Sequence, residues 1–180
     1  MERRKITLPL TRELARTLHA GDQVLLTGTI YTSRDAGHKR MCEALAKGEK
    51  IPFDPTDATI YYVGPTPAKP GEVIGSAGPT TSGRMDAYAP TMMSVGARGM
   101  IGKGARLPEV VDAMKKYDGV YFGASAVQEH FLQNASKSRA YRIRRPRSRS
   151  TPQALCGRHA ACIIIDSEGN NSTKRDVQST

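Results

Sequence analysis

QVLLTGTI, residues 23–30, is the apolar stretch from which the fold of this chain can be built. Its composition predicts a buried β-strand. A polar loop, YTSRDAGH (31–38), follows it. HKRMCEALAKG (38–48) then has the spacing of a helix, with Met41, Ala44 and Leu45 on one face and Gly48 at its end. A buried strand that leads through a polar loop into a helix is the building unit of a layered α/β domain.

The same alternation of strand and helix continues along the chain. Further strands are predicted at ATIYYVG (58–64), ARGMIGKG (97–104), GVYFGA (119–124) and ACIIIDSEGNN (161–171), the last with a turn. Helices are predicted at 11–18 with Thr11 as cap, at 84–96 where Pro90 should kink or delimit the helix, and at 107–119 with Pro108 in the first turn. We expect one α/β layered domain over residues 1–180.

The net charge of +10 is unevenly distributed. Residues 125–162 contain eight lysine or arginine residues and one acid, so this segment supplies +7 and the remainder +3. The remainder is ordinary for an enzyme domain, which makes a nucleic-acid partner an unfavoured interpretation. The three cysteines form neither a disulfide framework nor a metal site, no stretch is long and apolar enough for a membrane span, and the first residues lack a signal-peptide core. We therefore expect a cytoplasmic protein that holds no metal itself.

Three polar loops follow strands or glycine-rich turns, where backbone amides commonly face anions. Together they offer arginine, lysine and hydroxyl groups that suit a small dicarboxylate or a phosphate. They are TSRDAGH (32–38) with Arg34, Asp35 and His38; GPTTSGRMD (78–86) with Thr80, Thr81, Ser82, Arg84 and Asp86; and GKG (102–104) with Lys103.

Each of these residues also has a purely structural interpretation. Arg34 and Asp35 could form a surface ion pair, and His38 is expected to cap the following helix or bond to backbone rather than to catalyse. Thr80 and Thr81 could be helix caps. Lys103 between glycines is common in turns and does not form a Walker loop. Four methionines and three tyrosines are interpreted as core packing: Met92, Met93, Met100, Met114, Tyr61, Tyr62 and Tyr121.

In chain order, GTIYTSRDAGHKR, GPTTSGRMDAY, GKG and IIIDSEGNN resemble the beta subunit of class I iron–sulfur fumarate hydratases. The same module forms the C-terminal domain of single-chain versions and is related to the beta subunit of L-tartrate dehydratase. The resemblance covers residues 1–124 and 163–172. It implies a swivelling β/β/α domain and reversible hydration of fumarate to L-malate. It also implies a partner alpha subunit that carries the [4Fe–4S] cluster, whose open iron position acts as a Lewis acid, in an α2β2-type assembly.

The resemblance also implies roles for single residues. Arg34 and Arg84 correspond to the family's carboxylate-binding arginines, and Lys103 to its substrate-binding lysine. Thr80 corresponds to the proposed base that takes the C3 proton of malate, a role that needs its pKa lowered by neighbouring positive charge. We expect supporting roles for the remaining polar residues of the loops: Thr81 as the cap, Ser82 beside it, Asp35 orienting Arg34 or His38, and Asp86 orienting Arg84.

The chain departs from the family at residues 125–162, where a glycine- and alanine-rich helix and an acidic stretch would be expected. We interpret the basic peptide as the product of a shifted reading frame; the rival interpretation is a real basic loop that binds RNA or an acidic partner. A real peptide of this composition should be largely disordered. Two further functions stay open: an L-tartrate dehydratase beta subunit, less favoured because of Gly83, and a non-catalytic protein that binds anions or RNA.

Overall fold

The computed structural model describes residues 3–64, 70, 78–124, 142–144 and 153–175. Its strands are β1 (Arg4–Thr7), β2 (Gln23–Thr32), β3 (Thr59–Tyr61), β4 (Gly99–Gly102), β5 (Val120–Gly123), β6 (Arg142–Arg144) and β7 (Gln153–Ile165). Its helices are α1 (Arg12–Arg16), α2 (Asp35–Ala46), α3 (Ala89–Ser94), α4 (Pro108–Tyr117) and α6 (Ser172–Arg175), with a 3₁₀ turn, η1, at Ser82–Met85. The expected α/β class is confirmed, whereas the swivelling β/β/α arrangement and the single-domain extent stay predictions.

The helices begin at the residues that favour a helix start. Thr11 caps α1 by accepting a hydrogen bond from a first-turn amide at 3.3 Å. α2 begins at Asp35, earlier than expected, and places this carboxylate at its positive end. The helix expected over 84–96 is split into η1 and α3, because Pro90 has no amide hydrogen and fits only the first turn of α3. Pro108 starts α4 as predicted.

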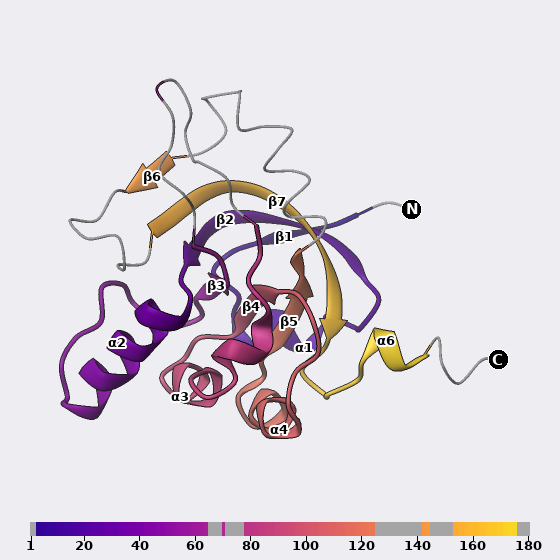
Figure 1. Cartoon of the computed structure of the whole chain (residues 1–180). Helices are drawn as coiled ribbons and strands as arrows, with labels where there is room; N and C mark the ends of the chain where they lie inside the picture. Colours follow the sequence, from indigo (N-terminus) through magenta and orange to yellow (C-terminus); the bar gives the residue numbers. More distant parts are fainter. Residues whose placement is uncertain (1–2, 65–69, 71–77, 125–141, 145–152, 176–180) are drawn as a thin grey trace.

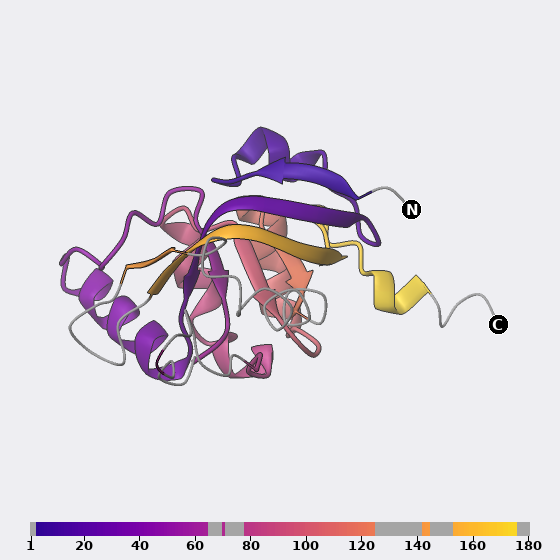
Figure 2. The ribbon, with the colours of Figure 1, turned by 90° about the horizontal axis from the view of Figure 1, so that it is seen from above.

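The strands form one sheet in the order β1-β2-β3-β4-β5-β7-β6, and β7 also pairs with β2. β1 to β5 are parallel neighbours, whereas β7 runs antiparallel to both β5 and β2. Strands β2, β3, β4, β5 and β7 therefore close into a ring, and Figure 1 shows β7 curving alongside β2. Figure 2 shows β1 and α1 on one side of the ring and α2 and α3 on the other.

Part of the basic segment lies among the described residues. Residues 153–162 form the first part of β7 and pair with β2 from Thr32 back to Gln23. β6 adds a short strand next to them. The physical reason is that β2 would otherwise present a long unpaired edge, which β7 covers while burying Ala160 and Ala161. The rest of the segment, 125–141 and 145–152, lies outside the described residues, and its origin stays an interpretation.

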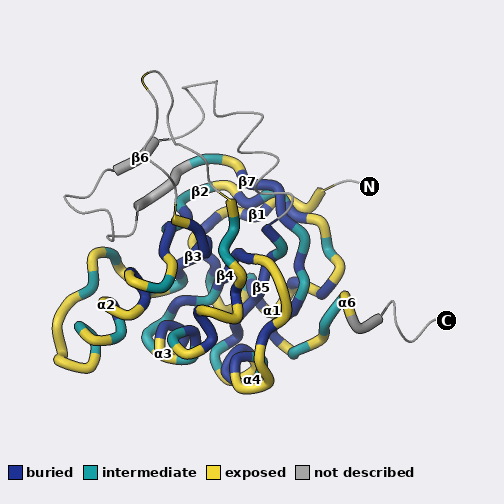
Figure 3. The backbone as a smooth tube through the Cα atoms, in the orientation of Figure 1, coloured by how far each residue is buried: buried dark blue, intermediate teal, exposed yellow. Residues whose placement is uncertain are grey.

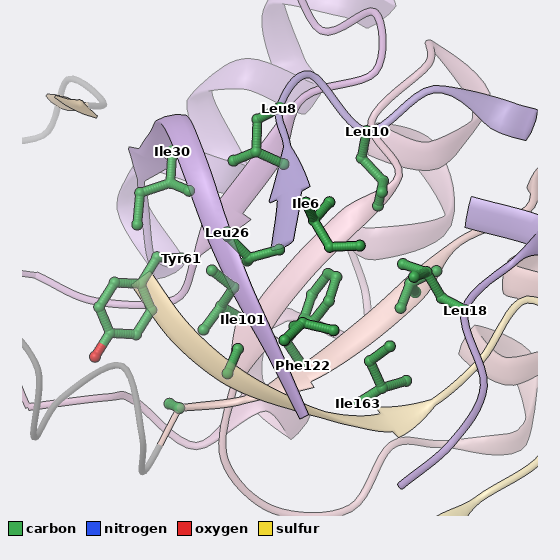
Figure 4. Close-up of a cluster of buried hydrophobic side chains, with 14 of the residues drawn as sticks. Ile6, Leu8, Leu10, Leu18, Leu26, Ile30, Tyr61, Ile101, Phe122 and Ile163 are labelled. Atoms are coloured by element: carbon green, nitrogen blue, oxygen red, sulfur yellow. The ribbon is translucent and has the colours of Figure 1, made fainter. Parts of the chain in front are cut away.

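Two hydrophobic clusters fill the two sides of the sheet. Side chains alternate along the strands, so Ile101 and Phe122 join the cluster next to β1 and α1, whereas Met100 and Tyr121 join the cluster under the helices. Figure 3 shows buried positions in the middle of the molecule and exposed positions along the outer sides of α2 and α4, and Figure 4 shows the first cluster in close-up. The core interpretation of the methionines and tyrosines is confirmed, since all of them are buried: Met92, Met93, Met100, Met114, Tyr61, Tyr62 and Tyr121.

The parallel strands place the three polar loops at one edge. β2, β3, β4 and β5 all point the same way, so their carboxyl ends lie together. The loop after β2 carries the TSRDAGH motif, and the loop after β4 carries GKG. The GPTTSGRMD motif returns to the end of β3 through a bridge between Val63 and Pro79. In the described part of the chain, no helix has the length and apolarity that crossing a bilayer needs.

We expect replacement of Phe122 by alanine to destabilise the fold by about 3–5 kcal/mol, because a fully buried ring is removed from the first cluster. Urea denaturation measures this change. Leu107, which is 56% exposed, provides the control, and Leu107→Ala should change the free energy of unfolding by less than about 0.5 kcal/mol. Equal effects of the two substitutions would contradict the described core.

Candidate functional site

The loop with the two threonines is attached to two strand ends by backbone hydrogen bonds. The Thr80 amide donates to the carbonyl of Tyr62 at 2.8 Å, just beyond β3. The Ser82 amide donates to the carbonyl of Lys103 at 2.9 Å, and Thr81 and Lys103 form a parallel bridge. The predicted second and third loops are thus joined. Thr80 is half-buried, while Thr81 and Lys103 are exposed.

Ser82 lies in a slot that only glycine leaves open. A Cβ added to Gly102 at the end of β4 would collide with the Ser82 hydroxyl. That hydroxyl lies 2.9 Å from the Tyr121 hydroxyl, which in turn donates to the carbonyl of Gly104 at 3.0 Å. Ser82 is completely buried. Ser82 therefore joins its loop to β5 through a buried hydrogen bond with Tyr121, and its supporting role in the site stays a prediction.

An ion pair connects the first loop to the second. The Arg84 Nε lies 3.0 Å from the Asp35 carboxylate at the start of α2, and the Arg84 side chain is 61% exposed. Asp35 was expected to orient Arg34 or His38, and it pairs with Arg84 instead. The guanidinium of Arg34 lies against the backbone of Gly64 after β3, where an added Cβ would approach its Nε to 2.5 Å. Arg34 is also exposed.

Asp86 does not orient Arg84, which corrects the expected pairing. Its Oδ1 accepts a hydrogen bond from the Arg106 Nε at 2.7 Å, and its Oδ2 accepts one from the Leu107 amide at 2.8 Å. The reason is the path of η1, which turns Asp86 inward toward the segment after β4. Both partners are buried, with the Arg106 side chain at 0% exposure and that of Asp86 at 2%.

Arg106 is the residue that sequence reasoning missed. Its guanidinium carbon lies 5.3 Å from the ring centre of Tyr62 and 5.0 Å from that of Tyr121. Nothing adjacent to Arg106 in the sequence indicates these partners. The sequence offers only an indirect signal: Arg106 lies between the glycine-rich turn and Pro108, which starts α4.

His38 makes the contact with backbone that the sequence predicts. Its Nδ1 lies 3.1 Å from the Ser33 hydroxyl and 3.3 Å from the Arg34 carbonyl, so the ring ties the start of α2 to the end of β2. Burial, with a smaller opposing contribution from the bond to Arg34, lowers the pKa of His38 to about 4. The ring is therefore neutral at neutral pH.

The site combines an exposed rim with a buried floor. The rim holds one hydroxyl-bearing loop and three basic side chains: Thr80, Thr81, Arg34, Arg84 and Lys103. The floor consists of His38, Ser82, Asp86, Arg106 and Tyr121. Such a rim can bind an anion with more than one carboxylate. Among the residues that the structure describes, no group of three His, Cys, Asp or Glu side chains is placed to hold a metal ion, so these residues do not fit an iron–sulfur cluster.

Replacement of Gly102 by alanine is expected to lower the free energy of unfolding by about 1–3 kcal/mol, because the new methyl group takes the place of the Ser82 hydroxyl. Chemical denaturation measures this loss. Gly83→Ala is the matched control, since an added Cβ there meets nothing within 4 Å. If both variants are as stable as the parent, the described slot is wrong.

The ring signals of His38 should titrate by NMR with a midpoint near pH 4 in the folded protein. The urea-unfolded chain should show the ordinary midpoint near about 6.5. Because the unfolded chain takes up this proton first, the contribution of His38 to stability is present above about pH 6.5 and lost as the pH falls toward 4. A folded-state midpoint above 6 would contradict the buried placement.

Comparison with known proteins identifies the family. A family model described as Fumarase C-terminus matches residues 1–139. The chain is 35% identical over 149 residues to the aerobic class I fumarate hydratase of Salmonella typhimurium, covering 81% of this chain and 26% of that protein. It is 40% identical over 105 residues to fumarate hydratase 2 of Leishmania major, covering 58% of this chain and 18% of that protein.

A relative of more similar length is the putative L(+)-tartrate dehydratase subunit beta of Methanocaldococcus jannaschii. It is 36% identical over 131 residues, which cover 71% of this chain and 67% of that protein. The chain thus spans only 18% and 26% of the two fumarate hydratases. Because the family model matches well over half of its residues, the chain belongs to the Fumarase C-terminus family.

Proposed function

We propose that this chain is the beta-type part of a class I fumarate hydratase, which catalyses the reversible hydration of fumarate to L-malate. The observation that carries the proposal is the joining of three loops at one sheet edge. The bridge from Thr81 to Lys103 and the ion pair from Arg84 to Asp35 draw the loops together beside Thr80. Membership of the Fumarase C-terminus family supports the same reaction.

Arg34, Arg84 and Lys103 hold the dicarboxylate in this proposal. Fumarate and malate carry two carboxylates, and an arginine can bind a carboxylate with two parallel hydrogen bonds. The two arginines come from different loops, which suits a substrate with an anionic group at each end. Lysine supplies a mobile point charge. Fixing both ends of the substrate limits its motion before the proton transfer.

Thr80 is the proposed base that takes the C3 proton of malate. Its amide is held by Tyr62, so its position relative to the sheet is set by the backbone. A threonine hydroxyl is a poor base on its own. The positive charges of Arg84 on the same loop and of Lys103 on the joined loop favour the deprotonated oxygen, which is the direction that this role requires.

We place the [4Fe–4S] cluster on a partner alpha subunit. The described residues offer no ligand group for it, and the fumarate hydratases named above are several times longer than this chain. The name "subunit beta" of the Methanocaldococcus jannaschii protein favours a separate partner chain. The proposed assembly is of the α2β2 type, in the cytoplasm.

L-tartrate dehydration is the second candidate activity. The observation in its favour is the match to the tartrate dehydratase subunit beta, of which this chain covers 67%, a larger share than of either fumarate hydratase above. Co-expression with an alpha-type partner under anaerobic conditions, followed by assays with L-malate and L-tartrate, distinguishes the two. Turnover of tartrate alone would overturn the fumarase assignment.

Thr80→Ala and Arg84→Ala should each reduce malate turnover by at least about 100-fold, because the first removes the proposed base and the second a carboxylate-binding group. Both residues lie on the rim, so complex formation should be unaffected, as size-exclusion chromatography can check. Thr7→Ala and Arg12→Ala are matched controls on β1 and α1, across the sheet, and should retain parent activity. Full activity of both rim variants would refute the site.

A further inference from the structure

Tyr121 carries a buried hydroxyl that the proposed chemistry does not use. The residue lies in β5 and is 1% exposed, with its ring in the cluster under the helices. A carbonyl oxygen can only accept, so the Tyr121 hydroxyl donates to the Gly104 carbonyl at 3.0 Å. Because the only hydroxyl proton of Tyr121 is used in this bond, the Ser82 hydroxyl, 2.9 Å away, donates to the tyrosine oxygen. One phenol thus joins two segments that are far apart in sequence.

The two segments are those that carry the proposed base and the substrate-binding lysine. Ser82 stands two residues after Thr80, and Gly104 directly follows Lys103. The Ser82 amide also donates to the Lys103 carbonyl at 2.9 Å. The separation between the Thr80 loop and Lys103 is therefore set by one direct backbone bond and by the bridge through Tyr121.

The ring of Tyr121 is held in position by its contact with Arg106. The guanidinium of Arg106 lies 5.0 Å from the ring centre of Tyr121 and is paired with Asp86, which also binds the Leu107 amide. Asp86 follows η1, and Arg106 follows the Lys103 turn. Burial raises the pKa of Tyr121, so its hydroxyl stays protonated and able to donate near neutral pH.

We propose that Tyr121 is a positioning residue, which holds the Thr80 loop at a fixed distance from Lys103 through its hydrogen bonds to Ser82 and Gly104. This inference rests on the proposed function for its consequence on turnover. Its structural part, the linking of the two loops, stands without it. A base and a lysine that must act on one small substrate lose rate when their separation varies.

Tyr121→Phe removes only the hydroxyl and keeps the packed ring. In the co-expressed complex, kcat for malate should fall by about tenfold or more while KM changes by less than about threefold, since the substrate-binding side chains remain. Tyr117→Phe is the matched control: Tyr117 lies at the end of α4, against Lys116. It should leave both constants unchanged. Equal kinetics of all three proteins would overturn the proposal.

A second measurement does not depend on activity. Hydrogen exchange in the full chain should show the Ser82 amide exchanging at least about tenfold faster in Tyr121→Phe, with the β2 amides unchanged. Faster exchange in a chain whose unsubstituted complex turns over neither malate nor tartrate would keep the linking role and refute the proposed function. Unchanged exchange, or acceleration throughout the sheet, would overturn the positioning role.

Discussion

The fold depends on the pairing of β2 along both of its edges. This ten-residue strand binds β1 with its first half and β3 with its end on one edge, and β7 along its whole length on the other. Since β7 also pairs with β5, the contact between β2 and β7 closes the ring. Without it, β2 and β7 would both present open edges, which are prone to association. The parallel strand ends that carry the polar loops are held in place by this closure.

In the site at that edge, the side chains that can reach a ligand are exposed, and the side chains that fix the loops are buried. Residues available to a ligand, such as Arg84 and Lys103, are exposed and attached through backbone bonds or a surface ion pair. The residues that fix the loops, such as Arg106 and Asp86, are buried. A buried charge pair of this kind contributes little net stability, but removal of either partner leaves an unpaired charge inside the protein. The pair therefore holds the Thr80 loop and the segment after Lys103 in one arrangement.

Sequence reasoning located the elements and the loops but not the contacts across them. Thr11 and Pro108 indicate helix starts through local chemistry and Pro90 a helix boundary, and the structure has a helix start at all three. The pairing of Asp86 with Arg106 depends on the turn of η1 and on a segment twenty residues away, which no local pattern encodes. The length of β7 was missed for the same reason: its start at Gln153 is decided by the open edge of β2, where the paired residue, Thr32, lies 121 residues earlier.

The ring closure has a consequence for the connection between β5 and β7. The chain leaves at Ala124, after the carboxyl end of β5, and re-enters at Gln153, opposite Thr32 at the end of β2. Both anchor points lie at the edge that carries the rim. Between them stand seven lysine or arginine residues and one glutamate. The sequence between these two anchor points carries a surplus of +6, so the rate at which a dianion arrives at this edge is expected to fall as salt is added.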